Sequence, residues 1–355
     1  MPATTGMKGA GYYDKHSTAQ RSAIQAIQHW VDDAVANLRL PAPAQPVTIL
    51  DLGSSEGRNA VRHMASIVAG LRRRTDQPLQ TIYSDLASND FNQLFANLEE
   101  ARCAGLFASG VYPEAAGGSF YGPLLPPGTV HLAICFNASH WLDLLPAVPL
   151  TDFVAYRRPL ATRPGLAASA EATAAFTRQA EQDLVRFLQC RARELVPGAK
   201  LLLASPGDTD NARICDGLYD VLNDACLDLI AAGQLEERMT MPCYYRTVAE
   251  LLAPLKREDS PVRAAFTVDR AESIDIQIPF LVEFRRGGDV AAYAAAYTGF
   301  LRAVSESVVR AAFDQPEREI ETIECLYERI RGRLLAEPER YWWRYTLVAA
   351  LLTRR

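Results

Sequence analysis

The chain has 355 residues, of which 49% are hydrophobic and 22% are charged, and its 21 glycines and 21 prolines are an ordinary share. This composition excludes fibrous and disordered proteins, and the length provides one large domain or two modest ones. The formal net charge of −5 leaves no broad basic surface for a phosphate backbone, so we expect no nucleic-acid partner.

The seven cysteines follow neither a metal-binding nor a disulfide spacing. Their number is odd, and no CxxC motif occurs. We therefore expect free thiols in a reducing compartment and a cytoplasmic protein. The sequence contains no apolar run of about 18 residues and begins without an apolar stretch, so we expect neither a membrane span nor a signal peptide.

The first part of the chain alternates predicted helices and strands. Residues 19–38 repeat apolar side chains at helical spacing, and the apolar, β-branched run at 47–52 is typical of a buried parallel strand. Residues 161–175 predict a loop. The same patterns predict further helices at 58–74, 90–100 and 176–195, and further strands at 81–85, 130–136 and 199–204. This alternation predicts an α/β fold with a doubly wound parallel sheet.

Helical patterns dominate the second part, at 206–260 and again at 289–340. These helices are too many to flank the sheet, so we expect some of them to form a cap. We therefore divide the chain into residues 1–205, an N-terminal arm and the sheet core with part of the cap near 150–175, and residues 206–355, a mixed helical cap with the remaining core strands.

A glycine turn follows the first predicted strand, in Ile49–Asn59. Gly53 allows a sharp bend, and ligands of doubly wound sheets bind at the carboxyl ends of such strands. The GxGxxG fingerprint of dinucleotide-binding proteins is absent. The spacing of Asp51, Gly53 and Gly57 is instead typical of S-adenosylmethionine (SAM) methyltransferases, in which the acid lies near a cationic amino acid. The alternative is a glycine turn in another kind of α/β protein.

Two further segments have both a functional and a structural interpretation. Asp85 ends the next strand, where a carboxylate can accept hydrogen bonds from both ribose hydroxyls or simply cap a turn. Gly9–Gln20 places two aromatic residues and several polar side chains before the first helix. Its structural interpretation is a flexible N-terminus in which Ser17 or Thr18 caps that helix.

The strand at 130–136 leads into Asn137–Trp141, which we expect to line the same crevice. Trp141 is either a packing anchor or a pocket wall that offers an N–H group. His140 is a base, a donor or a structural histidine. The small-residue and aromatic segment Gly118–Gly122 precedes this strand.

Together, and in this order, these segments resemble the SABATH family of SAM-dependent carboxyl methyltransferases, which also includes the N-methyltransferases of caffeine biosynthesis. The residues that match family patterns are Tyr13, Lys15, Ser17 and Gln20, and the segments Asp51–Asn59, Ser84–Asn92, Gly118–Tyr121, His140–Pro146, Glu194–Gly198 and Met241–Tyr245.

The resemblance implies a Rossmann-like methyltransferase sheet under a helical cap, with SAM as the cofactor and a homodimer as the assembly. It implies that Gln20 and Trp141 hold a substrate carboxylate, with His140 beside them. The positions implied to contact or shape the SAM site are Tyr13, Asp51, Gly53, Ser54, Asn59, Asp85, Leu86, Ser119 and Phe120. The implied substrate pocket contains Gln20, Asn137, His140, Trp141 and Tyr244.

The chain also departs from the family. Asn137 replaces a family tyrosine, and the segment where some plant members bind magnesium reads Glu237–Thr240, so we expect no metal site. The expected reaction is methyl ester formation on a small, partly apolar carboxylic acid, which is already ionised at pH 7 and needs no base. The alternatives are N-methylation or phenolic O-methylation, for which His140 is the best candidate base, and a catalytically silent SAM-fold partner.

Overall fold

The computed structural model of the chain describes residues 6–107, 109–162, 165, 167–235, 238–313 and 316–355. Within them, one mixed sheet has seven strands in the order β3-β2-β1-β4-β5-β7-β6. These strands are β1 (Val47–Leu52), β2 (Leu79–Asp85), β3 (Val111–Gly117), β4 (Val130–Phe136), β5 (Leu195–Pro206), β6 (Phe266–Ile276) and β7 (Tyr345–Arg354).

The N-terminal part of the chain forms the parallel half of the sheet. β1 pairs in parallel with β2 and with β4, and β5 continues the parallel order beside β4. Every residue of β1 and β4 is buried, as expected for apolar strands covered on both faces. Because the strand order reverses between β1 and β4, their carboxyl ends border the crevice where ligands of such sheets bind.

The C-terminal part departs from the expected parallel sheet. The last strand of the chain, β7, lies between β5 and β6 and pairs antiparallel with both. The fold class is nevertheless the expected α/β class, with helices that form a cap. The boundary at residue 205 stays a prediction.

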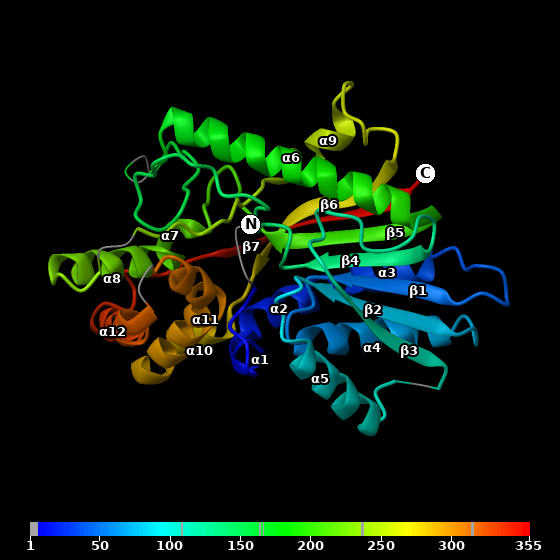
Figure 1. The fold of residues 1–355 in the computed structure, drawn as a ribbon, viewed down its shortest axis with the longest axis horizontal. Helices are drawn as coiled ribbons and strands as arrows, with labels where there is room; N and C mark the ends of the chain where they lie inside the picture. Colours follow the sequence, from blue (N-terminus) through cyan, green and yellow to red (C-terminus); the bar gives the residue numbers. More distant parts are fainter. Residues whose placement is uncertain (1–5, 108, 163–164, 166, 236–237, 314–315) are drawn as a thin grey trace.

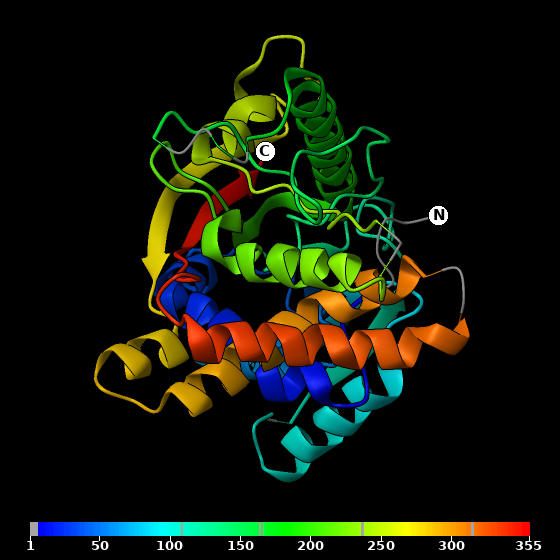
Figure 2. The same ribbon diagram turned by 90° about the vertical axis from the view of Figure 1, so that its left-hand side faces the viewer.

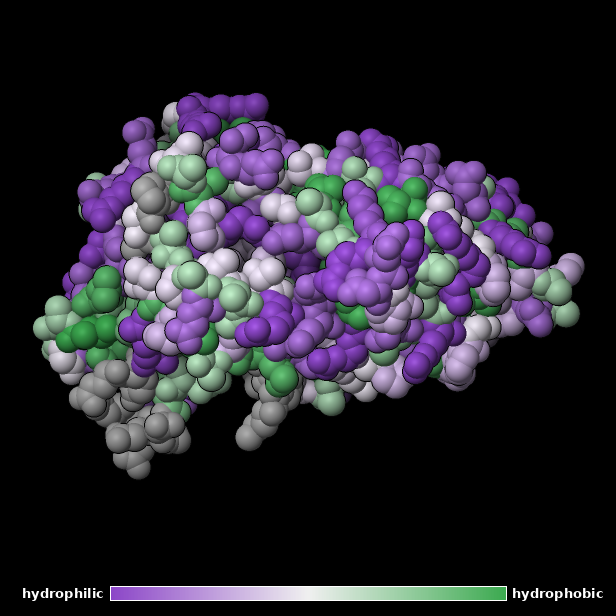
Figure 3. Space-filling model, turned by 90° about the horizontal axis from the view of Figure 1, so that it is seen from above, coloured by the Kyte–Doolittle hydropathy of each residue, from purple (hydrophilic) through white to green (hydrophobic). Residues whose placement is uncertain are grey.

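Helices cover both faces of the sheet and build the cap (Figure 1). The sheet-covering helices are α3 (Gln28–Ala36), α4 (Arg58–Arg72) and α5 (Phe91–Cys103) on one face, and α6 (Ala170–Glu194) and α9 (Val248–Lys256) on the other. The outward surface over α6 and α9 is mostly hydrophilic (Figure 3), while α6 buries residues at helical spacing against the sheet.

The cap lies beyond the carboxyl ends of the parallel strands. Its helices are α7 (Cys215–Leu218), α8 (Asp220–Ala231), α10 (Pro279–Arg285), α11 (Val290–Ala311) and α12 (Pro316–Ala336). Figure 2 shows α12 beside α8 and α11. The N-terminal helices α1 (Tyr12–His16) and α2 (Thr18–Ala26) lie between cap and sheet, and α1 packs on α11.

Two predicted elements differ in detail. The helix expected over 19–38 is interrupted at Ile27, whose φ of −108° and ψ of 15° separate α2 from α3. The loop expected over 161–175 ends earlier, because α6 begins at Ala170 in a run of good helix formers. The Ser169 side chain caps α6 by accepting a hydrogen bond from the Ala172 N–H.

A buried ion cluster fixes the cap to the segment that follows β4. The Arg157 guanidinium is almost fully buried and lies 2.8 Å from Asp152, 3.1 Å from Asp216 and 2.8 Å from Asp220. Because Asp216 and Asp220 belong to α7 and α8, this cluster ties the cap to residues 152–157. Among the described residues, no helix is both long and apolar enough to cross a bilayer.

Candidate active site

The glycine turn after β1 brings the backbone close to the end of β4. Gly53 has a φ of 90°, and a Cβ there would lie 2.5 Å from the Ala138 Cβ. Gly57 has a φ of 101°, and its Cβ would lie 2.4 Å from a methyl of Leu94. Both positions therefore require glycine, and they shape the turn before α4.

The Asp51 carboxylate lies buried beneath this turn. Its Oδ2 accepts a hydrogen bond of 2.6 Å from the Ser54 hydroxyl, and its Oδ1 lies 3.1 Å from Nε2 of His63. His63 belongs to α4 and is itself buried. No sequence motif indicates His63, although it follows Asp51 within the same strand–turn–helix unit.

Asp85 ends β2 beside the same turn. Its carboxylate accepts backbone hydrogen bonds from Ser55 at 2.7 Å and from Leu86 at 2.8 Å. Burial raises the pKa of Asp85 to about 6, and these two N–H groups limit the increase. The carboxylate is thus held by the backbone beside the cavity.

The N-terminal segment is fixed to the sheet domain, contrary to its interpretation as a flexible end. Ser17 precedes α2 but makes no side-chain cap; its hydroxyl accepts a hydrogen bond of 2.9 Å from the Asn59 amide. Asp14 is buried, and its carboxylate accepts a hydrogen bond of 2.6 Å from Asn97. These contacts hold Tyr13 against the turn after β1.

The end of β4 lies beside both the N-terminal segment and the last strand. Asn137 has a φ of 53°, a conformation that asparagine tolerates better than most residues. Its amide donates a hydrogen bond of 3.4 Å to the Gln20 backbone carbonyl, and its Oδ1 accepts one from the Tyr345 hydroxyl. Residues from three distant parts of the chain therefore meet at Asn137.

Three neighbouring cavities lie at this point, and Tyr13 and Asn137 line all of them. Cavity A, of about 670 Å³, is lined by Gly6, Met7, Tyr13, Gly53, Ser55, Asp85, Leu86, Ser119, Phe120, Tyr121, Phe136, Asn137, Ala138, Trp141, Leu142 and Asp143. Cavity B, of about 360 Å³, is lined by Tyr13, Asp14, Gln20, Ile24, Asp51, Gly53, Ser54, Ser55, Gly57, Asn59, Ala60, His63, Phe136 and Asn137. Cavity C, of about 470 Å³, is lined by Met7, Tyr13, Gln20, Asn137, His140, Trp141, Pro206, Ile214, Leu218, Tyr219, Tyr245, Phe300, Val304, Trp343 and Tyr345.

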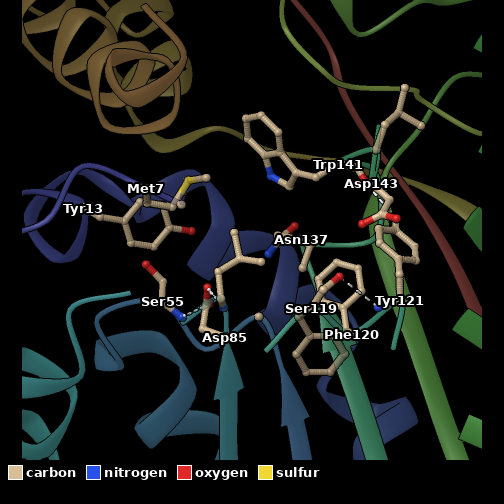
Figure 4. Close-up of a pocket in the computed structure, with 16 residues that line it drawn as sticks. Met7, Tyr13, Ser55, Asp85, Ser119, Phe120, Tyr121, Asn137, Trp141 and Asp143 are labelled. Carbon is tan, nitrogen blue, oxygen red and sulfur yellow. Dashed lines mark hydrogen bonds between the residues drawn. The ribbon is translucent and has the colours of Figure 1, made fainter. Parts of the chain in front are cut away.

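Figure 4 shows how the ends of the strands surround cavity A. Asp85 lies at its floor, Tyr13 and Phe120 lie on opposite sides, and Trp141 lies above Asn137. Because Trp141 lines both cavity A and cavity C, its indole belongs to the boundary between them.

His140 is a neutral residue in the wall of cavity C. Burial and the nearby Arg246 guanidinium lower the pKa of His140 to about 3. Its ring stacks on Tyr245 with a centroid separation of 5.6 Å, and its Nδ1 is buried without a hydrogen-bond partner among the described residues. A histidine with so low a pKa is a weak base at neutral pH.

The structure brings the sequence-predicted site residues into these three cavities, with the exception of Tyr244. Tyr244 stacks on Tyr156 at 5.4 Å, and its hydroxyl donates a hydrogen bond of 2.7 Å to Glu250. Its neighbour Tyr245 lines cavity C instead. Neighbouring side chains of an extended segment point in opposite directions, which explains why only one of the two tyrosines lines the cavity.

Cavity C also contains residues that the sequence motifs did not indicate, which come from the cap and from the start of β7. They are Ile214, Leu218, Tyr219, Phe300, Val304, Trp343 and Tyr345. Two sequence signals lie near them: the segment Met241–Tyr245, whose Tyr245 lines cavity C, and the aromatic run at 341–345. Among the described residues, no group of three or more His, Cys, Asp or Glu side chains could hold a metal ion, while Glu237 lies outside the described part of the chain. The expected lack of a metal stays a prediction.

Comparisons with known proteins agree with this geometry. A family model described as SAM dependent carboxyl methyltransferase matches residues 3–355. Gibberellic acid methyltransferase 2 of Arabidopsis thaliana is 29% identical over 69% of this chain and 68% of its own. Indole-3-acetate O-methyltransferase 1 of Oryza sativa subsp. japonica is 29% identical over 88% of this chain and 83% of its own. A solved structure of loganic acid methyltransferase with SAH has a TM-score of 0.78 at 21% identity, covers 98% of both chains, and shares the fold.

Proposed function

The chain belongs to the family of SAM-dependent carboxyl methyltransferases, and we propose that it forms the methyl ester of a small, partly apolar acid bound in cavity C. In this proposal Gln20 and Trp141 orient the substrate carboxylate. Both residues line cavity C, and their amide and indole N–H groups are neutral donors. Neutral donors aim a carboxylate without neutralising it, so it stays nucleophilic.

Cavities A and B contain the groups that a sulfonium nucleoside with an amino-acid tail requires. When bound, SAM supplies the electrophilic methyl group. Asp85 can accept hydrogen bonds from the ribose hydroxyls. In cavity B, Ser55 Oγ, Asn59 Oδ1 and His63 Nδ1 are buried without hydrogen-bond partners among the described residues, which suits the polar amino-acid end.

The low pKa of His140 is the observation that favours a carboxylate acceptor. A carboxylic acid with a pKa near 4 is ionised at pH 7, so the site needs to orient and desolvate it but not to deprotonate it. A phenol with a pKa near 10 requires a base, and an imidazole with a pKa near 3 is far too weak for that task. Phenolic O-methylation is therefore the less favoured alternative, as is N-methylation of an amine that binds protonated.

A His140→Gln variant tests this choice through its pH profile. With a carboxylic acid as acceptor, we expect kcat to stay close to that of the wild type between pH 6 and 9. General-base catalysis typically contributes about 10²- to 10⁴-fold, so a loss of that size together with a flattened pH profile would assign His140 as a base and favour the alternative.

The assembly and location of the protein are part of the same proposal. We propose a homodimer on the basis of the family resemblance, and a molecular mass by light scattering of twice 39.1 kDa would support it. We propose the cytoplasm because all seven cysteines are free thiols, as is usual in a reducing compartment. Fractionation of the native host would test this location.

A further inference from the structure

His63 lies on α4 at cavity B, and its contact with Asp51 is not used in the proposed reaction. The residue is 6% exposed, and of the three cavities it lines B alone. Its ring packs edge-on against Phe136, the last residue of β4, at a centroid distance of 5.1 Å and an angle of 77°. Packing therefore fixes the imidazole between α4 and the sheet.

The hydrogen bonds of Asp51 fix the direction of its carboxylate. Oδ2 accepts from the Ser54 hydroxyl at 2.6 Å, and Oδ1 lies 3.1 Å from Nε2 of His63. Because an ionised carboxylate accepts and cannot donate, the second hydrogen bond requires the imidazole proton on Nε2. One donor on each oxygen opposes rotation about the Cβ–Cγ bond, and each oxygen keeps a lone pair for a further partner.

Asp51 is also a buried carboxylate without a basic side chain beside it. The other carboxylate of cavity B, that of Asp14, lies 3.7 Å from Arg58. Among the described residues, no lysine or arginine forms an ion pair with Asp51, whose partner is His63. Buried carboxylates are normally paired with a cation, so a cationic group of a ligand in cavity B would complete the surroundings of Asp51.

We propose that His63 is a positioning residue for the cofactor: by donating from Nε2, its neutral imidazole holds the Asp51 carboxylate in place to receive the ammonium group of SAM. This inference rests on the proposed function, because it takes the amino-acid end of SAM to bind in cavity B. His63 then acts on the affinity for ligands that carry the ammonium group, including the product S-adenosylhomocysteine (SAH).

The test compares SAH with deamino-SAH, in which a hydrogen atom replaces the ammonium group while the nucleoside and the carboxylate stay. The preference for SAH is the ratio of the two Kd values, measured by calorimetry. A merely structural role of His63, in packing α4 on the sheet, affects both ligands and leaves this ratio unchanged.

Two variants of His63 differ in where they place an amide. The side-chain amide of glutamine reaches as far as Nε2 of histidine, so His63→Gln keeps a donor for Asp51. The amide of asparagine reaches only as far as Nδ1, so His63→Asn loses that donor.

A second buried histidine provides the matched control. His131 accepts a hydrogen bond of 3.1 Å at its Nδ1 from the Thr48 N–H of β1, and it lines none of the three cavities. His131→Gln moves the polar group away from Thr48, so it disturbs β1 without changing the wall of cavity B.

We expect the wild type to prefer SAH, and His63→Asn to lower that preference about tenfold, as for the loss of a hydrogen bond to a charged group. His63→Gln and His131→Gln should keep most of the wild-type preference. An equal loss for both ligands in His63→Asn, a His63→Gln as impaired as His63→Asn, or no preference for SAH in the wild type would overturn the inference but not the proposed function.

The wild-type protein provides an independent measurement if His63→Asn does not fold. In its complex with SAH at mildly alkaline pH, nitrogen NMR should show His63 as the neutral tautomer protonated at Nε2. A proton on Nδ1 would overturn the inference. If neither SAM nor SAH binds to the wild type, the proposed function itself fails.

Discussion

Replacing Trp141 with phenylalanine removes the indole N–H and keeps an aromatic ring, so it tests the contribution of the N–H alone. The residue is only 8% exposed, and its backbone is held by a hydrogen bond of 3.1 Å to the Ala138 carbonyl and by an antiparallel bridge to Cys243. The Tyr121 hydroxyl also donates to the Trp141 carbonyl. A phenylalanine ring can therefore occupy the same place, so the variant loses little besides the donor.

The size of the effect follows from the type of bond. A hydrogen bond from the indole to a substrate carboxylate is charge-assisted and contributes about 1.5–3 kcal/mol. At about 1.4 kcal/mol for each factor of ten, Trp141→Phe should lower kcat/KM for an acid about 10- to 150-fold. SAM affinity should change much less, because Asp85, Asn59 and the β1 turn are unaltered.

The assay is steady-state ester formation, with SAM binding measured by calorimetry on the same preparations. Trp30→Phe serves as a control, because Trp30 is a buried indole in the core that lines none of the three cavities and whose N–H has no partner among the described residues. An unchanged kcat/KM in Trp141→Phe, with SAM binding intact, would refute the proposed hydrogen bond from the Trp141 indole to the substrate carboxylate.

Three further predictions concern the cofactor cavity and the cap. In the protein without SAM, burial raises the pKa of Asp85 from 3.8 to about 6, so its carboxylate is protonated as the pH falls through 6. The Kd for SAM should therefore rise by up to about fivefold between pH 6 and 5. Calorimetric titrations should show that Asp85→Asn removes this dependence, and the same slope in both proteins would contradict it. Gly53→Ala places a methyl 2.5 Å from the Ala138 Cβ at a φ of 90°, so the free energy of unfolding should fall by about 1–3 kcal/mol. SAM should also bind more weakly. Denaturant unfolding measures the first effect and calorimetry the second, and an unchanged stability would contradict the close approach of the two chain segments. Arg157→Met removes the guanidinium that pairs with Asp152, Asp216 and Asp220, of which Asp152 is almost fully buried, so the free energy of unfolding should fall by about 3–5 kcal/mol. Chemical denaturation measures the loss, and an unchanged stability would contradict this role of the ion cluster.

The buried parallel strands were predictable, and the outer strands were not. β1 and β4 are continuous apolar runs because both of their faces are covered. β3 is an exposed edge strand that contains Pro113 and Glu114, so it lacks an apolar pattern. β7 is rich in leucine and alanine, residues equally compatible with a buried helix, and its antiparallel placement depends on pairing with β5 and β6.

The candidate site likewise contains residues that were predictable from the sequence and residues that were not. The turn at Gly53 and the strand-end residue Asp85 were predictable, because topology alone places strand ends in one crevice. The pairing of His63 with Asp51 has no sequence motif, since it arises from the way α4 packs on β1. Phe300 and Trp343 reach cavity C only through the packing of the cap, which local patterns do not specify. The part of the cavity C wall formed by Phe300 and Trp343 is therefore the part that local sequence patterns did not indicate.

Carboxyl methylation is tested most directly by methyl transfer from labelled SAM to a panel of aromatic, indolic and aliphatic carboxylic acids, each paired with its amide and with a phenol or amine analogue. We expect the label to appear as a base-labile ester, and only with free acids. Label on the phenol or amine analogues instead, or SAM binding without transfer to any acid, would contradict it.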